Sequence, residues 1–131
     1  MAIYDFHWFA VHIALNGLLL WLLAVNVSRL RMKLRIAYGD GGNNDMNQAI
    51  RTHANGVENV MIYSFILLAL TFVGVANWVM ATMVLAFLAG RVLHAIGMLQ
   101  RNFTARRVGA GITFLAEIVA IVVLLVGVFS K

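Results

Sequence analysis

Four stretches of mainly apolar residues follow one another along the chain, and short polar segments separate them. Each stretch holds about 20 residues, the length that an α-helix needs to cross the hydrocarbon core of a bilayer. The pattern predicts helices over residues 6–36, 45–73, 78–100 and 105–129 in a single four-helix transmembrane domain, residues 1–131. Because the connections are short, we expect an all-α membrane protein, an up-down antiparallel bundle.

Turn-forming and capping residues indicate where the helices end. Gly39 is expected to close the first helix in a left-handed cap. Asp45, with Gln48 three residues later, is typical of a capping box that opens the second helix. Asn102 or Thr104 is expected to cap the fourth.

Composition and charge place the chain in a membrane and give it an orientation. Hydrophobic residues make up 63% of the sequence, against roughly 45–50% in soluble domains. The net charge of +5 does not indicate nucleic acid, because the basic residues cluster beside the apolar stretches. The other side of the membrane holds Lys131 alone. Seven basic residues flank the first and third connections, namely Arg29, Arg31, Lys33, Arg35, Arg101, Arg106 and Arg107. This imbalance predicts both termini outside and these connections in the cytoplasm.

The absence of cysteine narrows the chemistry. Disulfides, thiolate metal sites and a protein thiol nucleophile are excluded, so any thiol must come from a ligand. His7 and His12 lie five residues apart, a poor metal spacing, and we expect both at the membrane interface. No metal site is predicted. Asn16 and Asn26 are expected to form hydrogen bonds with neighbouring helices.

A polar stripe opens the second apolar stretch. Arg51, Asn55 and Glu58 are spaced i, i+4 and i+7, so they share one helical face. Each charge at membrane depth costs roughly 2.5–3.5 kcal/mol, so the stripe must face other helices or a polar ligand. Either Arg51 pairs with Glu58 to fix helix packing, or the stripe binds a ligand.

Further charged groups gather at the same end of the predicted bundle. Arg91 and His94 lie one turn apart on the third helix. Arg106 and Arg107 begin the fourth helix, where cations oppose the helix dipole unless an anion binds nearby. Glu117, deeper in that helix, is expected to pair inside the bundle. The excess of positive charge predicts an anionic ligand from the cytoplasm, and the apolar walls can admit a lipophilic molecule from the bilayer.

Two motifs carry a family resemblance: Arg51-x-His53-x-Asn55-x-x-Glu58-Asn59, and Gly90-Arg91-Val92-x-His94. They resemble the MAPEG family, membrane-associated proteins in eicosanoid and glutathione metabolism, and residues 35–42 are similar to its short bacterial members. The resemblance covers essentially the whole chain. It implies a homotrimer in the bacterial inner membrane, with glutathione sites between adjacent subunits that open to the cytoplasm.

The resemblance also implies an activity and roles for individual residues. Members typically conjugate glutathione, their co-substrate, to lipophilic electrophiles or reduce lipid hydroperoxides, and some bind without catalysis. Arg51, Asn55 and Glu58 match residues that hold the peptide part of glutathione. His94 matches a position on the third helix that lines the site, and Arg91 beside it is a further candidate for binding. Arg107 best matches the arginine that faces the sulfur, and Arg106 is the one-residue alternative.

The chain departs from the family pattern where tyrosine, another hydroxyl residue or a basic residue is typical, at Met98, Gly111, Val108 and Ala54. These departures keep a runner-up open, a non-catalytic membrane binding or scaffold protein for glutathione, a lipid or a partner. A small transporter or channel subunit is a third class, but it requires polar residues through the full bilayer depth. A haem-binding bundle that uses His53 and His94 is a further alternative.

Overall fold

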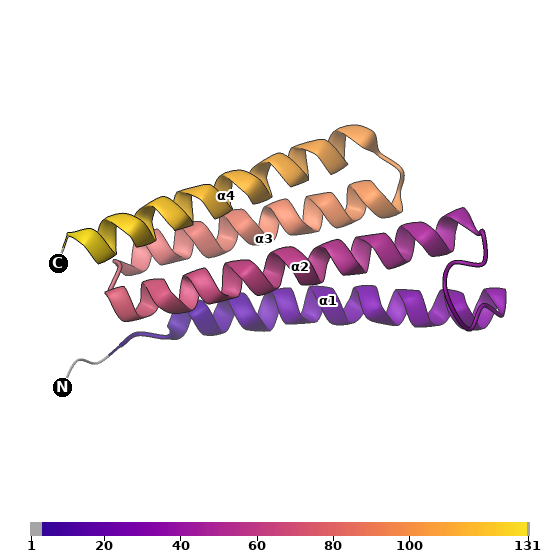
Figure 1. Cartoon of the computed structure of the whole chain (residues 1–131), viewed down its shortest axis with the longest axis horizontal. Coiled ribbons are helices and arrows are strands. Elements are labelled where there is room, and N and C mark those ends of the chain that lie inside the picture. The colour runs from indigo at the N-terminus through magenta and orange to yellow at the C-terminus, as the bar shows by residue number, and fades with distance from the viewer. Residues whose placement is uncertain (1–3, 131) are drawn as a thin grey trace.

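The computed structural model describes residues 4–130, and four α-helices occupy almost all of them. Their bounds are α1 His7–Leu34, α2 Asn44–Val73, α3 Asn77–Leu99 and α4 Phe103–Phe129. The helices run alternately up and down, and both termini lie at the same end (Figure 1). The predicted four-helix up-down bundle is confirmed, and each helix begins and ends within two residues of its predicted bounds.

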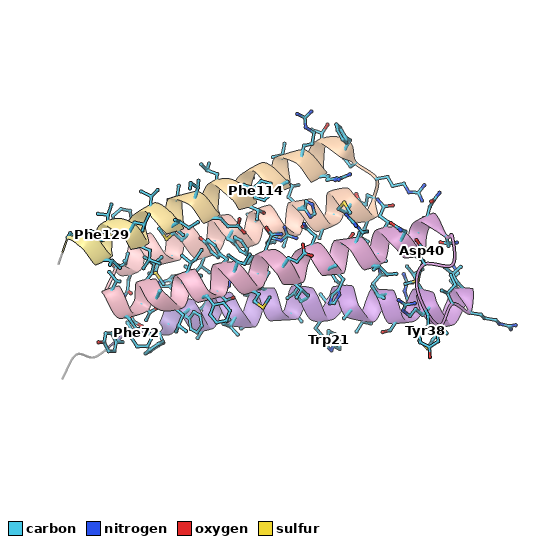
Figure 2. All side chains as sticks on the ribbon, in the orientation of Figure 1. Trp21, Tyr38, Asp40, Phe72, Phe114 and Phe129 are labelled. Atoms are coloured by element: carbon cyan, nitrogen blue, oxygen red, sulfur yellow. The ribbon has the colours of Figure 1, made fainter. Side chains whose placement is uncertain are left out.

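The helices α2 and α3 lie between α1 and α4 (Figure 1). Within residues 4–130, α1 contacts α2 and α3 but not α4. The outer helices therefore carry broad apolar faces without a partner in the chain, and Trp21 and Phe114 point away from the bundle (Figure 2). All four helices are long and apolar enough to cross a membrane. Such a surface belongs in lipid or against another subunit, which makes this an integral membrane protein.

The core is concentrated in the half of the bundle that contains the termini. Tyr63 stacks on Phe87 with ring centroids 3.9 Å apart and an angle of 3° between the rings. The Tyr63 hydroxyl donates to the Met83 carbonyl at 3.1 Å. Its polar atom therefore has a partner, and its ring contributes apolar contact area.

His12 lies in this core, so its predicted place at the membrane interface is wrong. The side chain is fully buried, and its Nε2 lies 2.9 Å from the Ser64 hydroxyl oxygen on α2. Its Nδ1 lies 3.1 Å from the amide nitrogen of Asn16. The imidazole is buried because both ring nitrogens have polar neighbours. Asn16 itself bonds within α1, and the bond across to α2 comes from His12.

The α1–α2 and α3–α4 connections lie together at the end opposite the termini, hereafter the loop end (Figure 1). Here α1 ends at Arg35, which adopts the left-handed conformation with φ of 56°. The Arg31 guanidinium donates to the carbonyls that follow, those of Ile36, Ala37 and Gly39. The predicted Gly39 cap is therefore wrong, since Arg35 is the left-handed cap residue and its backbone N–H bonds to the Arg31 carbonyl.

The caps of α2 and α4 are both asparagines. The Asn43 side chain accepts a backbone N–H of the first α2 turn at 3.0 Å. The capping box predicted at Asp45 and Gln48 is therefore wrong, because the helix already begins one residue before Asp45. Asn102 caps α4 through a bond of 3.0 Å, as predicted for one of two candidates.

Glycines bring the backbones of α3 and α4 into direct contact. A Cβ added at Gly97 would lie 2.7 Å from the Cα of Arg106, and one at Gly109 would lie 2.7 Å from the Cα of His94. Small residues allow this close approach between membrane helices. The contact fixes the rotation of α4 relative to α3, and it thereby decides which α4 side chains face α2.

Candidate functional site

A polar cleft of about 410 Å³ opens at the loop end, where α2 begins, α3 ends and α4 begins. We call it the loop-end cleft. The residues that line it are Asn44, Asn47, Gln48, Arg51, Met98, Arg101 and Arg106. Three arginines make it electropositive, and the amino-terminal ends of α2 and α4 add positive potential. The cleft is suited to an anion.

One carboxylate offsets part of this charge. The Arg101 guanidinium lies 2.5 Å from the Asp45 carboxylate, and both side chains are exposed. Exposed pairs of this kind contribute about 0–1 kcal/mol. Within the described residues, Arg51 and Arg106 form no ion pair, so their charges remain available to a ligand.

Residues of neighbouring elements hold the cleft together. The Gln48 amide donates to the Met98 carbonyl on α3, and its oxygen accepts from Arg101 at 3.2 Å. Asp40, on the loop between α1 and α2 (Figure 2), accepts the Asn47 amide at 2.6 Å. That hydrogen bond, with a second from the Gly42 N–H, lowers the pKa of the Asp40 carboxyl. The loop therefore positions a side chain that lines the cleft.

The predicted stripe of Arg51, Asn55 and Glu58 starts in the cleft and runs away from it along α2. Arg51 lines the cleft, and Glu58 is exposed further along. Seven residues of helix rise about 10 Å. Arg51 and Glu58 form no ion pair in the part of the chain that the structure describes. The alternative in which this pair fixes helix packing is therefore without the contact that it requires.

Arg91 and His94 lie behind this stripe, in the interior. Arg91 is 2% exposed, and its guanidinium donates to the Asn55 side-chain oxygen at 3.0 Å. His94 is 6% exposed and lies against the backbone of Gly109. Neither side chain lines the loop-end cleft. Arg91 reaches the stripe through Asn55, which connects α3 to the exposed face of α2.

The two arginines at the start of α4 face different directions. Arg106 lines the loop-end cleft. The Arg107 guanidinium lies 5.4 Å from the centre of the Phe103 ring, in a separate hollow of about 270 Å³ that Val108 also lines. Adjacent residues on a helix point about 100° apart. The structure therefore groups Arg106, and not Arg107, with Arg51.

Asn44, Asn47 and Gln48 also line the cleft, and sequence reasoning did not include them in the site. A signal was present: positions 44, 48, 51, 55 and 58 continue the helical spacing of the stripe toward the start of α2. Two of the family departures are found beside the site. Met98 lines the loop-end cleft, which has no hydroxyl side chain among its described lining residues. Val108 lines the hollow of Arg107, where the hydroxyl-bearing side chain is that of Thr104 instead.

The arrangement can bind an anion and can hold its polar parts along one face of α2. Arginine grips carboxylates through two parallel hydrogen bonds. Asn55 offers an amide beside the cleft, and Glu58 offers an acceptor for a cationic group. A ligand with carboxylates near one end and an ammonium group further along matches this order of charges.

Comparison with known proteins identifies the family. The sequence matches the MAPEG family over residues 9–126. Two relatives, each called inner membrane protein YecN, come from Escherichia coli strains K12 and CFT073. Each is 38% identical over 107 residues, which cover 82% of this chain and 82% of the relative. The match confirms the resemblance that the two motifs indicated, and the chain belongs to the MAPEG family.

Proposed function

We propose that this protein is a membrane-bound glutathione-dependent transferase or peroxidase that acts on lipophilic electrophiles or hydroperoxides. The observation that carries the proposal is the loop-end cleft, where Arg51 and Arg106 meet beside a polar stripe on apolar helices. Membership of the MAPEG family supports glutathione as the co-substrate. The chain has no cysteine, so the reacting thiol belongs to the ligand.

Glutathione carries two carboxylates, one ammonium group and one thiol. In this proposal Arg51 and Arg106 bind carboxylate groups in the cleft, and Asn55 binds the peptide part. Glu58 binds the ammonium group further along the stripe. Arg91 and His94 support these contacts from the interior.

Arg107 is the residue that we propose to face the sulfur, on the basis of its match to the family pattern, with Arg106 as the alternative. A thiol with a pKa near 8.5 is mostly protonated at neutral pH, and the thiolate is the nucleophile. A guanidinium beside the sulfur favours the thiolate, and one pKa unit corresponds to about 1.4 kcal/mol. The amino-terminal end of α4 acts in the same direction.

Two reactions follow from a stabilised thiolate. With an electrophile, the sulfur forms a bond to carbon while the leaving group departs with its electron pair. With a hydroperoxide, two glutathione molecules are oxidised to their disulfide while the peroxide is reduced to an alcohol and water. The hollow beside Arg107, which Phe103, Thr104 and Val108 also line, is a mainly apolar place for the lipophilic partner.

The exposed charges on α2 favour a homotrimer. Arg51 and Glu58 lie exposed on a helix that is long and apolar enough to cross a membrane. Facing lipid with these charges would cost several kcal/mol, so we propose that a second copy covers them. The basic residues of the loop end favour a cytoplasmic location for the cleft, with both termini outside. The relatives named as inner membrane proteins support the bacterial inner membrane.

Calorimetry of the detergent-solubilised protein with glutathione tests the binding. Turnover of an aromatic chloride activated by nitro groups tests the transferase reaction, and a lipid hydroperoxide tests the peroxidase reaction. Saturable binding with turnover supports the proposal. Absence of both, in a preparation that native mass spectrometry shows to be trimeric, contradicts it.

A specific observation favours a second candidate, a non-catalytic binding or scaffold protein. No tyrosine, serine or threonine lines the loop-end cleft in the structure of residues 4–130. The positions where family members typically have tyrosines or another hydroxyl residue are Met98, Gly111 and Val108. Such a protein would bind glutathione, a lipid or a partner and would leave the thiol pKa unshifted.

A further inference from the structure

Arg91 is a buried cation whose charge the described contacts do not balance. It is 2% exposed, and one of its terminal nitrogens donates to Asn55. The same nitrogen lies 3.9 Å from a Cβ added at Gly56, so the guanidinium is inserted beneath α2. Its Nε is buried and has no hydrogen-bond partner among the described residues. A buried charge without a counterion costs several kcal/mol.

The chain offers few carboxylates that can be the counterion. Of its five acidic residues, Asp5 and Asp40 lie outside the helices, and Asp45 is paired with Arg101. Glu58 is exposed on the face of α2. The remaining carboxylate is that of Glu117 on α4.

Glu117 has the acceptor that Arg91 lacks. Its Oε1 is buried and has no hydrogen-bond partner in the described part of the chain. Glu117 lies one helical turn after Thr113, whose backbone nitrogen is 3.0 Å from a Cβ added at Gly90, the residue before Arg91. The two side chains come from adjacent helices, α3 and α4, and are separated by more than a direct ion-pair distance of 4.0 Å. A buried donor and a buried acceptor, each without a partner, are the groups that an internal water bridges.

We propose that Glu117 is the counterion of Arg91, joined to its Nε through one bridging water, and that this pair positions Asn55 for the ligand. The inference rests on the proposed function for its consequence in binding, but the pair itself can be tested without ligand. Arg91 is held between Glu117 on one side and Asn55 on the other. Without the carboxylate, the Arg91 guanidinium is better solvated near the polar loop-end cleft. It therefore moves toward the cleft, and its hydrogen bond to Asn55 is lost.

Glu117 is therefore a positioning residue, acting on the α2 stripe through Arg91. The contact with Asn55 is a hydrogen bond to a charged group, worth about 1.5–3 kcal/mol. Loss of the lower value corresponds to about a tenfold weaker affinity. Glu117→Gln should therefore weaken glutathione binding about tenfold, and Glu117→Asp, which retains the charge, should recover most of the affinity.

The experiment compares wild type, Glu117→Gln, Glu117→Asp, the single changes Arg91→Glu and Glu117→Arg, and the charge reversal that combines these two. Asp5→Asn removes a carboxylate that lies just before α1, where it accepts from Asn77 at the start of α3, and it is the matched control. Glutathione dissociation constants and thermal unfolding midpoints are measured for each trimer. The reversed pair should recover stability relative to Arg91→Glu alone but not affinity, because a carboxylate on α3 cannot donate to the Asn55 oxygen.

Three results decide the inference. The inference is supported if glutathione affinity falls for Glu117→Gln and returns for Glu117→Asp. In the reversed pair, the unfolding midpoint should recover while the affinity stays low. It is overturned if Glu117→Gln binds like wild type and Asp5→Asn. If wild type does not bind glutathione, the proposed function fails, and the unfolding midpoints still decide the pair: additive effects of the two reversals overturn it, and mutual rescue supports it.

Discussion

The two arginines in the first turn of α4 are proposed to have different roles in glutathione binding and thiol activation. Arg106 lies in the loop-end cleft with Arg51, and Arg107 lies over the Phe103 ring in the neighbouring hollow. If the cleft binds carboxylates and the hollow faces the sulfur, Arg106→Ala should weaken binding. Arg107→Ala should instead raise the pKa of the bound thiol and leave most of the affinity.

The magnitudes follow from the exposure and charge of these groups. A hydrogen bond to a charged group contributes about 1.5–3 kcal/mol. Because Arg106 is exposed, solvent screens the interaction, and the lower end applies. We therefore expect Arg106→Ala to raise the glutathione dissociation constant about tenfold. For Arg107→Ala we expect the thiol pKa to rise by about one unit, equivalent to about 1.4 kcal/mol.

Calorimetry measures the dissociation constants, and the absorbance of the thiolate, followed against pH, measures the thiol pKa. Lys33→Ala removes a cation from the loop end outside the cleft and is the control for net charge. Opposite results, with a shifted pKa for Arg106→Ala and weak binding for Arg107→Ala, would refute the division of roles. Both alanine variants matching Lys33→Ala would refute the site at the start of α4.

Three further changes test separate parts of the account. Glu58→Gln should weaken glutathione binding while native mass spectrometry still shows the trimer; loss of the trimer with binding retained would instead favour a role in assembly. Gly97→Leu should lower the unfolding temperature strongly, since overpacking costs about 1–3 kcal/mol or more where a side chain meets the Arg106 backbone. Gly111→Ala, which meets no atom within 4 Å, is its control and should be neutral. Asn43→Ala should destabilise by about 1 kcal/mol through loss of the α2 cap, measured by thermal unfolding.

The helices and their order could be predicted from the sequence because bilayer thickness sets the length of an apolar stretch. The capping residues and the partners of buried polar groups were less predictable, because they depend on contacts between residues separated along the chain. Gly39 had the right residue type for a left-handed cap, but the Arg31 side chain binds the carbonyls beyond Leu34, and α1 ends there. His12 had a polar side chain near a helix end, but Ser64 gives it a buried partner.

The stripe on α2 could be read from helical spacing, since residues at i, i+4 and i+7 share a face in any helix. The contact from Arg91 to Asn55 could not, because it depends on how α3 packs against α2. The direction of the α4 arginines depends on the rotation that Gly97 and Gly109 impose. A match to a family motif gives a position in the chain, and one residue of difference changes the direction of a helical side chain by about 100°.

The measurement that tests the central claim most directly is the pH titration of the thiolate absorbance of glutathione bound to the wild-type trimer. A guanidinium and a helix amino-terminal end beside the sulfur should lower the thiol pKa by about one to two units, or about 1.4–2.8 kcal/mol. If the protein is a glutathione-dependent enzyme, the pKa of the bound thiol should lie below that of free glutathione by this amount. A bound thiol with the pKa of free glutathione would contradict it and leave a binding protein.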